Sequence, residues 1–267
     1  MSVAHTARVF RALLRVGASE SIAYRTEVVV WLLSTTMPLV MIAFYTAVVR
    51  DGAVGRYGEA EIVAYFLAAF VVRSLTGSFI SRQINVEVRD GTLASRLLRP
   101  VHPLLAYAAE SVGALPVRVA VAVPIALGML VFLRRGALAT DPVVWLAFLA
   151  SLAGAWLLSL LVSFAVGALS FFLDWSDKVM DAWLAGLFVF SGYTIPVDLF
   201  PERLRPVVEW LPFRYQIGLP TELLVGAHDR AEALSLLGRQ WLFVLGAALL
   251  VRLLWQRGVG RFAAFGG

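Results

Sequence analysis

The sequence contains no cysteine, a single lysine and few charged residues. Without cysteine the chain forms neither a disulfide nor a thiolate metal site. The one lysine, Lys178, follows Asp174-Trp175-Ser176-Asp177 and not a glycine-rich loop, so the sequence lacks the phosphate-binding loop of an ATPase. We also expect no cleavable signal peptide, because arginines interrupt the first 25 residues where an apolar block would be needed.

Charged residues make up only 15% of the 267 residues, and hydrophobic residues make up 60%. Soluble domains carry about 25% charged residues, so this is the composition of an integral membrane protein. A spanning helix needs about 20 apolar residues, so the length fits one polytopic domain over 1–267, without a soluble catalytic domain. The net charge of +5 favours anionic headgroups of a lipid bilayer over nucleic acid, because no basic cluster is interleaved with aromatic residues.

Apolar stretches predict an all-α integral membrane protein with six transmembrane helices. We expect the six spans at 28–49, 62–80, 113–133, 143–169, 179–195 and 236–255. Residues 1–25 predict an interfacial helix that lies along the membrane surface, with apolar residues near one face and arginines on the other. Arginine and lysine are more frequent on the side of the two termini, which predicts that both termini are cytoplasmic.

A polar segment, residues 86–103, separates the second predicted span from the third. Asp90-Gly91 is a turn signal, and Thr92 can cap a short helix that ends before Pro100. The segment is either a connector on the membrane surface or a docking element for a soluble partner, whose register its charges would set. Its central residues are Glu87, Arg89, Asp90, Gly91, Leu93 and Arg96.

The stretch after the fifth predicted span is rich in prolines and charges. That span has only about 17 residues before Pro196 and rises about 25 Å, which is short of the roughly 30 Å hydrocarbon core. Helical spacing predicts a short helix over 202–211, with Pro201 or Pro206 in its first turn and Arg205 on the water-facing side. Its expected apolar face consists of Leu204, Val207, Val208 and Leu211.

A second apolar piece follows at 215–225 and is expected to be broken at Pro220 and to end at Gly226. Non-helical backbone within a membrane is tolerated where protein surrounds it or where it lines a cavity. We therefore expect residues 196–226 to form two short re-entrant helices that complete the outer leaflet.

Arg73 is an unusual charge within the second predicted span. It could form a structural ion pair with Glu110, near the inner end of the third span, or snorkel toward the cytoplasm. A role in substrate binding or gating is the remaining alternative, which transport and assembly measurements on Arg73→Leu would test.

Short motifs in the two non-membrane segments share a resemblance. The outer motifs are Ser191-Gly192, Pro196, Phe200-Pro201, Leu204, Leu211-Pro212-Phe213 and Gly226. Their order and spacing resemble the membrane subunits of ATP-binding-cassette exporters of the type-2 permease family. The inner motifs, Asp90-Gly91-Thr92-Leu93 and Leu97-Leu98-Arg99-Pro100, are similar to the coupling segment of one bacterial branch, which also tends to end in a tail like Gly266-Gly267.

The resemblance implies the permease subunit of an exporter in the cell inner (plasma) membrane. A second permease subunit, identical or paralogous, would complete a path for an amphiphilic substrate, and two ABC ATPase subunits would bind ATP and Mg. This chain would hold no cofactor or metal and would not be an enzyme. Residues 86–103 would be the coupling segment and residues 196–226 the outer segment. The implied gate residues are Ser191, Gly192, Pro196, Pro201, Leu204, Pro212 and Phe213.

Two other classes of protein remain open. A membrane scaffold or receptor without a transport cycle would need no ATPase, so copurification of an ATPase would distinguish it. An intramembrane lipid-modifying enzyme is disfavoured, because His5, His102 and His228 are isolated and no paired acidic motif lies in a span.

Overall fold

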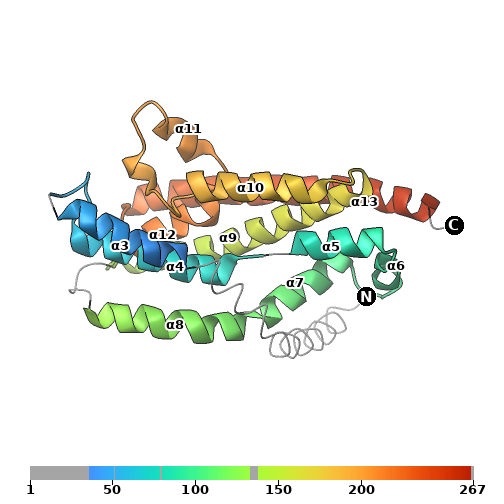
Figure 1. The fold of residues 1–267 in the computed structure, drawn as a ribbon, viewed down its shortest axis with the longest axis horizontal. Coiled ribbons are helices and arrows are strands. Elements are labelled where there is room, and N and C mark those ends of the chain that lie inside the picture. Colours follow the sequence, from blue (N-terminus) through green and yellow to red (C-terminus); the bar gives the residue numbers. More distant parts are fainter. Residues whose placement is uncertain (1–35, 51, 79, 133–137, 266–267) are drawn as a thin grey trace.

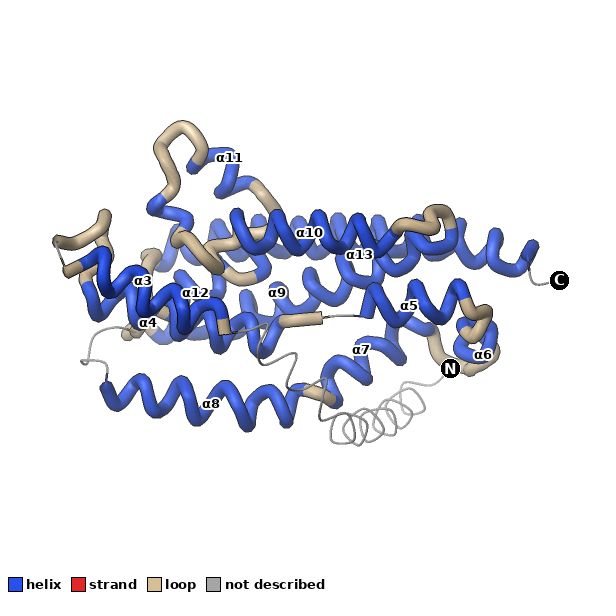
Figure 2. The backbone as a smooth tube through the Cα atoms, in the orientation of Figure 1, coloured by secondary structure: helices blue, strands red, loops and turns tan. Residues whose placement is uncertain are grey.

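The computed structural model describes residues 36–50, 52–78, 80–132 and 138–265, and the regular elements in these ranges are helices (Figure 1, Figure 2). The longer helices are α3 (Met37–Val49), α4 (Glu59–Thr76), α5 (Ile80–Arg89), α7 (Pro103–Gly113), α8 (Leu115–Phe132), α9 (Pro142–Ala168), α10 (Ser176–Phe190) and α13 (Arg230–Phe265). The short helices are α6 (Leu93–Leu97), η1 (Leu169–Phe171), η2 (Val197–Leu199), α11 (Arg205–Trp210), η3 (Arg214–Gln216) and α12 (Gly218–Leu224). The all-α prediction is confirmed, while the interfacial helix predicted over 1–25 and the beginning of the span predicted over 28–49 lie outside the described residues.

Within the described ranges, four helical stretches are long and apolar enough to cross a membrane. They are Glu59–Arg89, Pro103–Pro124, Pro142–Phe171 and Arg230–Phe262. The second stretch begins ten residues before the span predicted over 113–133, because the helical run already starts at Pro103. α10 has 15 residues and ends at Phe190, so it rises about 22 Å and is even shorter than predicted.

α9 is the central helix of the bundle. Asp141 starts it by accepting a hydrogen bond from the Val143 N–H (2.8 Å), and an apolar run continues it to Ala168, close to the predicted 143–169. α9 packs against α4, α5, α10, α12 and α13. Small residues allow these close contacts, because a Cβ atom at Gly167 would lie only 2.8 Å from the Ile84 side chain of α5.

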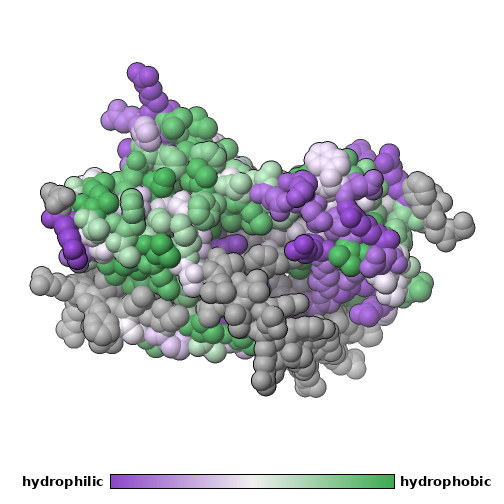
Figure 3. Space-filling view, viewed as in Figure 1, coloured by the Kyte–Doolittle hydropathy of each residue, from purple (hydrophilic) through white to green (hydrophobic). Residues whose placement is uncertain are grey.

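The coupling segment and the outer segment lie at opposite ends of the bundle. α6 lies at the end that the last turns of α13 also reach, while α11 and α12 lie toward the other end, near α3 (Figure 1). Figure 3 shows hydrophobic side chains over α3 and the second half of α10, and hydrophilic side chains gathered at the α5–α6 end. The apolar surface therefore lies between two ends of more polar character.

Candidate functional site

The coupling segment consists of the end of α5, a tight turn and α6. Gly91 has a φ of 74°, a left-handed conformation that favours glycine, so the predicted Asp90-Gly91 turn is confirmed. Thr92 precedes α6 as expected, but its side chain makes no capping hydrogen bond. Leu93 is fully buried in the main hydrophobic core and anchors α6 to the bundle.

Arg96 is the centre of a charge cluster that joins the coupling segment to α7. Its guanidinium nitrogens lie 2.8 Å from Glu87 Oε2 and 2.7 Å from Glu110 Oε1, and its Cζ lies 4.3 Å from the centroid of the Tyr107 ring. Tyr107 Oη donates to Glu87 Oε2 (2.5 Å), and Gln83 Nε2 donates to both carboxylates at 3.3 Å. The arginine side chain is only 13% exposed, so the cluster is largely withdrawn from water and holds α5, α6 and α7 together.

This cluster changes the expected roles of two acidic residues. Glu110 bonds to Arg96 rather than to Arg73, so the predicted Arg73–Glu110 pair is not formed among the described side chains. Glu87, expected to set the register of a partner, instead faces Arg96 and is 15% exposed. Arg73 lies on α4, and its role in structure or gating stays a prediction.

Other side chains of the coupling segment remain exposed. Leu98 is 87% exposed and Val86 is 50% exposed, and Arg89 and Asp90 are also exposed. They lie at the end of the bundle where hydrophilic side chains gather (Figure 3). We call Val86, Arg89, Asp90 and Leu98 the exposed face of the coupling segment.

At the other end of the bundle, the turn at Ser191-Gly192 is held tightly between α4 and α12. Gly192 has a φ of 87°, and its carbonyl accepts a hydrogen bond from Tyr65 Oη (3.0 Å). A Cβ atom at Gly192 would lie 2.5 Å from Tyr65 Oη, and one at Gly218 would lie 2.6 Å from the Ser191 carbonyl oxygen. Both glycines are therefore required for the close approach of these backbones.

Alanine at Gly192 is expected to lower the free energy of unfolding by about 2 kcal/mol. The positive φ costs about 1–2 kcal/mol for an L-residue, and displacement of Tyr65 Oη adds the loss of a hydrogen bond. Thermal unfolding of the purified chain measures this loss. Gly246→Ala on α13 is the matched control, because open space surrounds that glycine, and a similar loss in both variants would contradict this interpretation.

Prolines organise the beginning of the outer segment. Pro196 precedes η2, and Pro201 begins a turn in which its carbonyl accepts from the N–H groups of Leu204 (2.8 Å) and Arg205 (3.0 Å). This turn delays α11, which begins at Arg205 rather than at the predicted 202. Pro206 lies in the first turn of α11, as one of the two predicted alternatives.

The side chains of α11 are distributed differently from the prediction. Val208 is 2% exposed and packs with Val197 of η2 and with Phe200, whereas Leu204 and Val207 are 53% and 59% exposed. Arg205, expected on the water-facing side, is half-buried and donates to the Asp198 carbonyl (2.7 Å). Only part of the predicted apolar face is thus covered by this chain.

Pro212 and Phe213 turn the chain from α11 back toward α10. The Phe213 ring lies 4.7 Å from the Trp183 ring and 6.3 Å from the Phe190 ring, both on α10. A Cβ atom at Gly186 would lie 2.5 Å from Phe213, so the glycine leaves space for this ring. Phe213 therefore packs the outer segment against α10.

The second predicted short helix is α12, which is buried inside the bundle. Pro220 does not break it, because the proline lies in the first turn, where no amide hydrogen is needed. The break falls instead at Ile217, between η3 and α12, and Gly226 ends the piece with a φ of 68°, as predicted. Residues 218–223 are all buried, and α12 packs against α4, α9 and α13.

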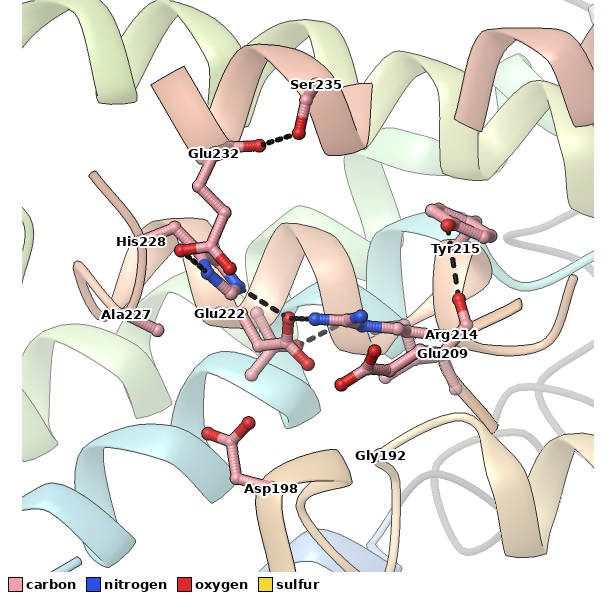
Figure 4. Close-up of polar contacts among 12 residues, drawn as sticks. Gly192, Asp198, Glu209, Arg214, Tyr215, Glu222, Ala227, His228, Glu232 and Ser235 are labelled. Carbon is pink, nitrogen blue, oxygen red and sulfur yellow. Dashed lines mark hydrogen bonds and ion pairs between the residues drawn. The ribbon is translucent and has the colours of Figure 1, made fainter. Parts of the chain in front are cut away.

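Glu222 of α12 belongs to a buried ionic cluster that the sequence interpretation missed (Figure 4). Its Oε2 atom lies 2.7 Å from Arg214 Nη2 and 2.8 Å from His228 Nε2. The other ring nitrogen, His228 Nδ1, lies 2.9 Å from Glu232 Oε2 at the start of α13. The cluster therefore connects η3, α12 and α13.

Charge neutralisation keeps the buried carboxylate of this cluster ionised. Burial raises the pKa of Glu222, but Arg214 and His228 outweigh burial and hold this pKa below its ordinary value. Burial lowers the pKa of His228, and Glu222 and Glu232 outweigh burial and raise it. Among the described residues, no group of three or more acidic or histidine side chains is arranged to hold a metal ion.

The sequence carried one signal for this cluster. Glu222 is the only charged residue in the apolar piece 215–225, and an ionisable residue in such a setting indicates a special role. His228 is isolated in the sequence. Its partners were not recognisable, because the fold and not the local sequence brings Arg214 and Glu232 beside it.

A comparison with protein families decides the class of this protein. A family model described as "ABC-2 family transporter protein" matches residues 30–266. The chain belongs to the ABC-2 transporter family. No curated protein matches it. Membership in this family and the apolar helices together show that this ABC-2 protein is a multi-pass membrane component of a transporter. Such a component works with an ABC ATPase and is generally not the ATPase itself.

Proposed function

We propose that this ABC-2 protein is the permease subunit of an exporter in the inner (plasma) membrane, with both termini cytoplasmic. A second permease subunit, identical or paralogous, completes the path, and two ABC ATPase subunits bind ATP and Mg and drive transport. The observation that carries the proposal is the placement of two packed segments, the coupling segment and the outer segment, at opposite ends of one bundle.

The Arg96 cluster supports a mechanical role for the coupling segment. A partner that pushes α6 displaces Arg96, and Arg96 is bonded to Glu87 of α5 and to Glu110 of α7. α5 packs against α9 and α10, and α9 packs against α12. A movement of α6 is therefore passed through packed helices to the outer segment.

The outer segment is the proposed gate. α12 and the Ser191-Gly192 turn close the outer end through the Tyr65 hydrogen bond and the packing of Phe213 on α10. Alternating access needs an element with two discrete arrangements, and these short helices joined by turns are suited to it. The apolar character of the helices between the two ends favours an amphiphilic substrate such as a drug, a lipid or a lipid-linked glycan.

Substitution of the exposed face tests the partnership with the ATPase. Leu98→Asp and Asp90→Arg are each expected to reduce copurification of the partner ATPase by about tenfold, since loss of about 1.4 kcal/mol of binding energy has this effect. Both side chains are exposed, so the variants should retain the thermal stability of the unaltered chain.

Glu202→Arg provides the matched charge reversal at the opposite end of the bundle and should leave copurification unchanged. Glu87 is unsuitable for this test, because reversing its charge would break the internal Arg96 cluster. Unchanged copurification in both coupling variants would overturn the docking assignment, and the absence of any bound ATPase would favour a scaffold or receptor.

A further inference from the structure

His228 occupies a position that requires a proton on each ring nitrogen. Nε2 lies 2.8 Å from Glu222 Oε2 and Nδ1 lies 2.9 Å from Glu232 Oε2, so both nitrogens face carboxylate acceptors (Figure 4). A neutral imidazole carries only one N–H and can donate to only one of these carboxylates. The observed arrangement is therefore that of the imidazolium ion.

The two carboxylates respond differently when the imidazolium loses a proton. Glu222 is 1% exposed and is held by Arg214, so it stays in the bundle. Glu232 is 55% exposed and can turn into water. Loss of the second N–H therefore breaks the link to Glu232 and separates the α12 side of the cluster from α13.

The charged groups on the elements around His228 form contacts of their own. Arg56, in the loop before α4, donates to the Ala227 carbonyl (3.1 Å) and pairs with Asp198 of η2 at 2.8 Å. Tyr57 Oη donates to the same Asp198. The remaining charges nearby form their own contacts: Arg214 with Glu222, Arg230 with Asp141, and Asp229 with the N–H of Glu232.

We propose that His228 is a proton-controlled tie that fixes α12 to α13 when it is charged and releases α12 when it is neutral. The idea that this contact controls the outer gate rests on the proposed function. The tie itself is a property of this chain alone and can be measured without an ATPase. Because the folded pKa of His228 is raised, the tie is complete below the unfolded value of about 6.5 and is lost as the pH rises through the folded value.

The absence of native cysteine allows a direct test by single-cysteine labelling in lipid nanodiscs. Thr221→Cys places a small thiol at a fully buried position of α12, and Ala231→Cys places the reference thiol at an exposed position of α13. The measurement is the labelling rate with a charged methanethiosulfonate between pH 6 and 9, taken as the ratio of Thr221→Cys to Ala231→Cys. This ratio removes the pH dependence common to both thiols. It is expected to rise by about tenfold, the effect of losing one charge-assisted hydrogen bond.

Two further variants identify the titrating group. With His228→Gln the ratio should be high at all pH values, because no imidazolium forms. Glu232→Gln alters a half-exposed side chain and should shift the midpoint of the rise to lower pH by about one unit, since one of the two carboxylates is removed. A pH-independent ratio in the unaltered background, or an unchanged midpoint in Glu232→Gln, would overturn the proposal.

Discussion

Glutamine in place of Glu222 is expected to lower the free energy of unfolding by about 3–5 kcal/mol. Arg214 is 4% exposed, so loss of the carboxylate charge leaves its guanidinium buried without an opposite charge. His228 loses the same partner, which lies 2.8 Å from its Nε2 atom. Thermal unfolding in detergent measures this effect, and a loss of this size lowers the Tm by roughly 10 °C.

The control for this variant is an ion pair of the same kind on the surface. Asp181→Asn breaks the ion pair with Lys178. The Asp181 and Lys178 side chains are 65% and 76% exposed, so this variant should lower the free energy of unfolding by less than about 1 kcal/mol. Equal Tm shifts for Glu222→Gln and Asp181→Asn would show that burial of the Glu222 pair has no energetic consequence.

A double variant separates charge from packing. Replacing both Arg214 and Glu222 with methionine removes the two charges together, so the Arg214 guanidinium is not left buried without its partner, and His228 keeps its contact with Glu232. Such replacements in other proteins are often neutral or stabilising, and the double variant should therefore unfold at a higher temperature than Glu222→Gln. If the double variant is no more stable than Glu222→Gln, the loss of stability comes from changed packing around α12 and not from the unpaired charge.

Helices that depend on local sequence were predicted most accurately. The span expected over 143–169 corresponds to α9, Pro142–Ala168, because Asp141-Pro142 is a strong start signal and the long apolar run that follows contains no charged residue. The Asp90-Gly91 turn was also predictable, since a left-handed backbone at this point favours glycine.

The predictions for the outer segment were wrong where one residue type is compatible with two local structures. Pro220 ends a helix when it lies in the interior but is compatible with the first turn, and the sequence did not reveal which turn it occupies. The burial of α11 was misjudged for a similar reason. Helical spacing defines an apolar face, but the neighbours that cover Val208 and leave Val207 exposed are set by the fold.

Charge pairing was the least predictable feature, because it depends on contacts between distant elements. Glu110 lies 14 residues after Arg96 in the sequence and on a different helix, α7, beyond the turn that follows α6. Arg73 lies deep within the second predicted span and Glu110 near the inner end of the third, which made the two residues natural candidate partners. The coupling segment folds back onto α7 and supplies Arg96 instead.

Alanine in place of Arg96 is expected to cost about 2–4 kcal/mol, at the lower end of the range for a broken buried pair because its partners are 15% and 21% exposed. Glu87 and Glu110 then repel each other, and α6 loses its ionic link to α7. Besides a lower Tm, we expect faster tryptic cleavage after the exposed Arg89, because detachment of α6 loosens the turn that precedes it.

Two variants test whether this effect comes from the position of Arg96 or from its charge alone. Arg82→Ala removes an exposed arginine from α5 and should change the free energy of unfolding by less than about 0.5 kcal/mol. Arg96→Lys keeps the charge but cannot reproduce the planar, multiple contacts of the guanidinium, so it should lie between Arg96→Ala and the unaltered chain. If Arg96→Ala leaves both the Tm and the cleavage rate unchanged, the coupling segment is held by Leu93 and core packing, and the Arg96 cluster cannot be the link that carries its movement to α7.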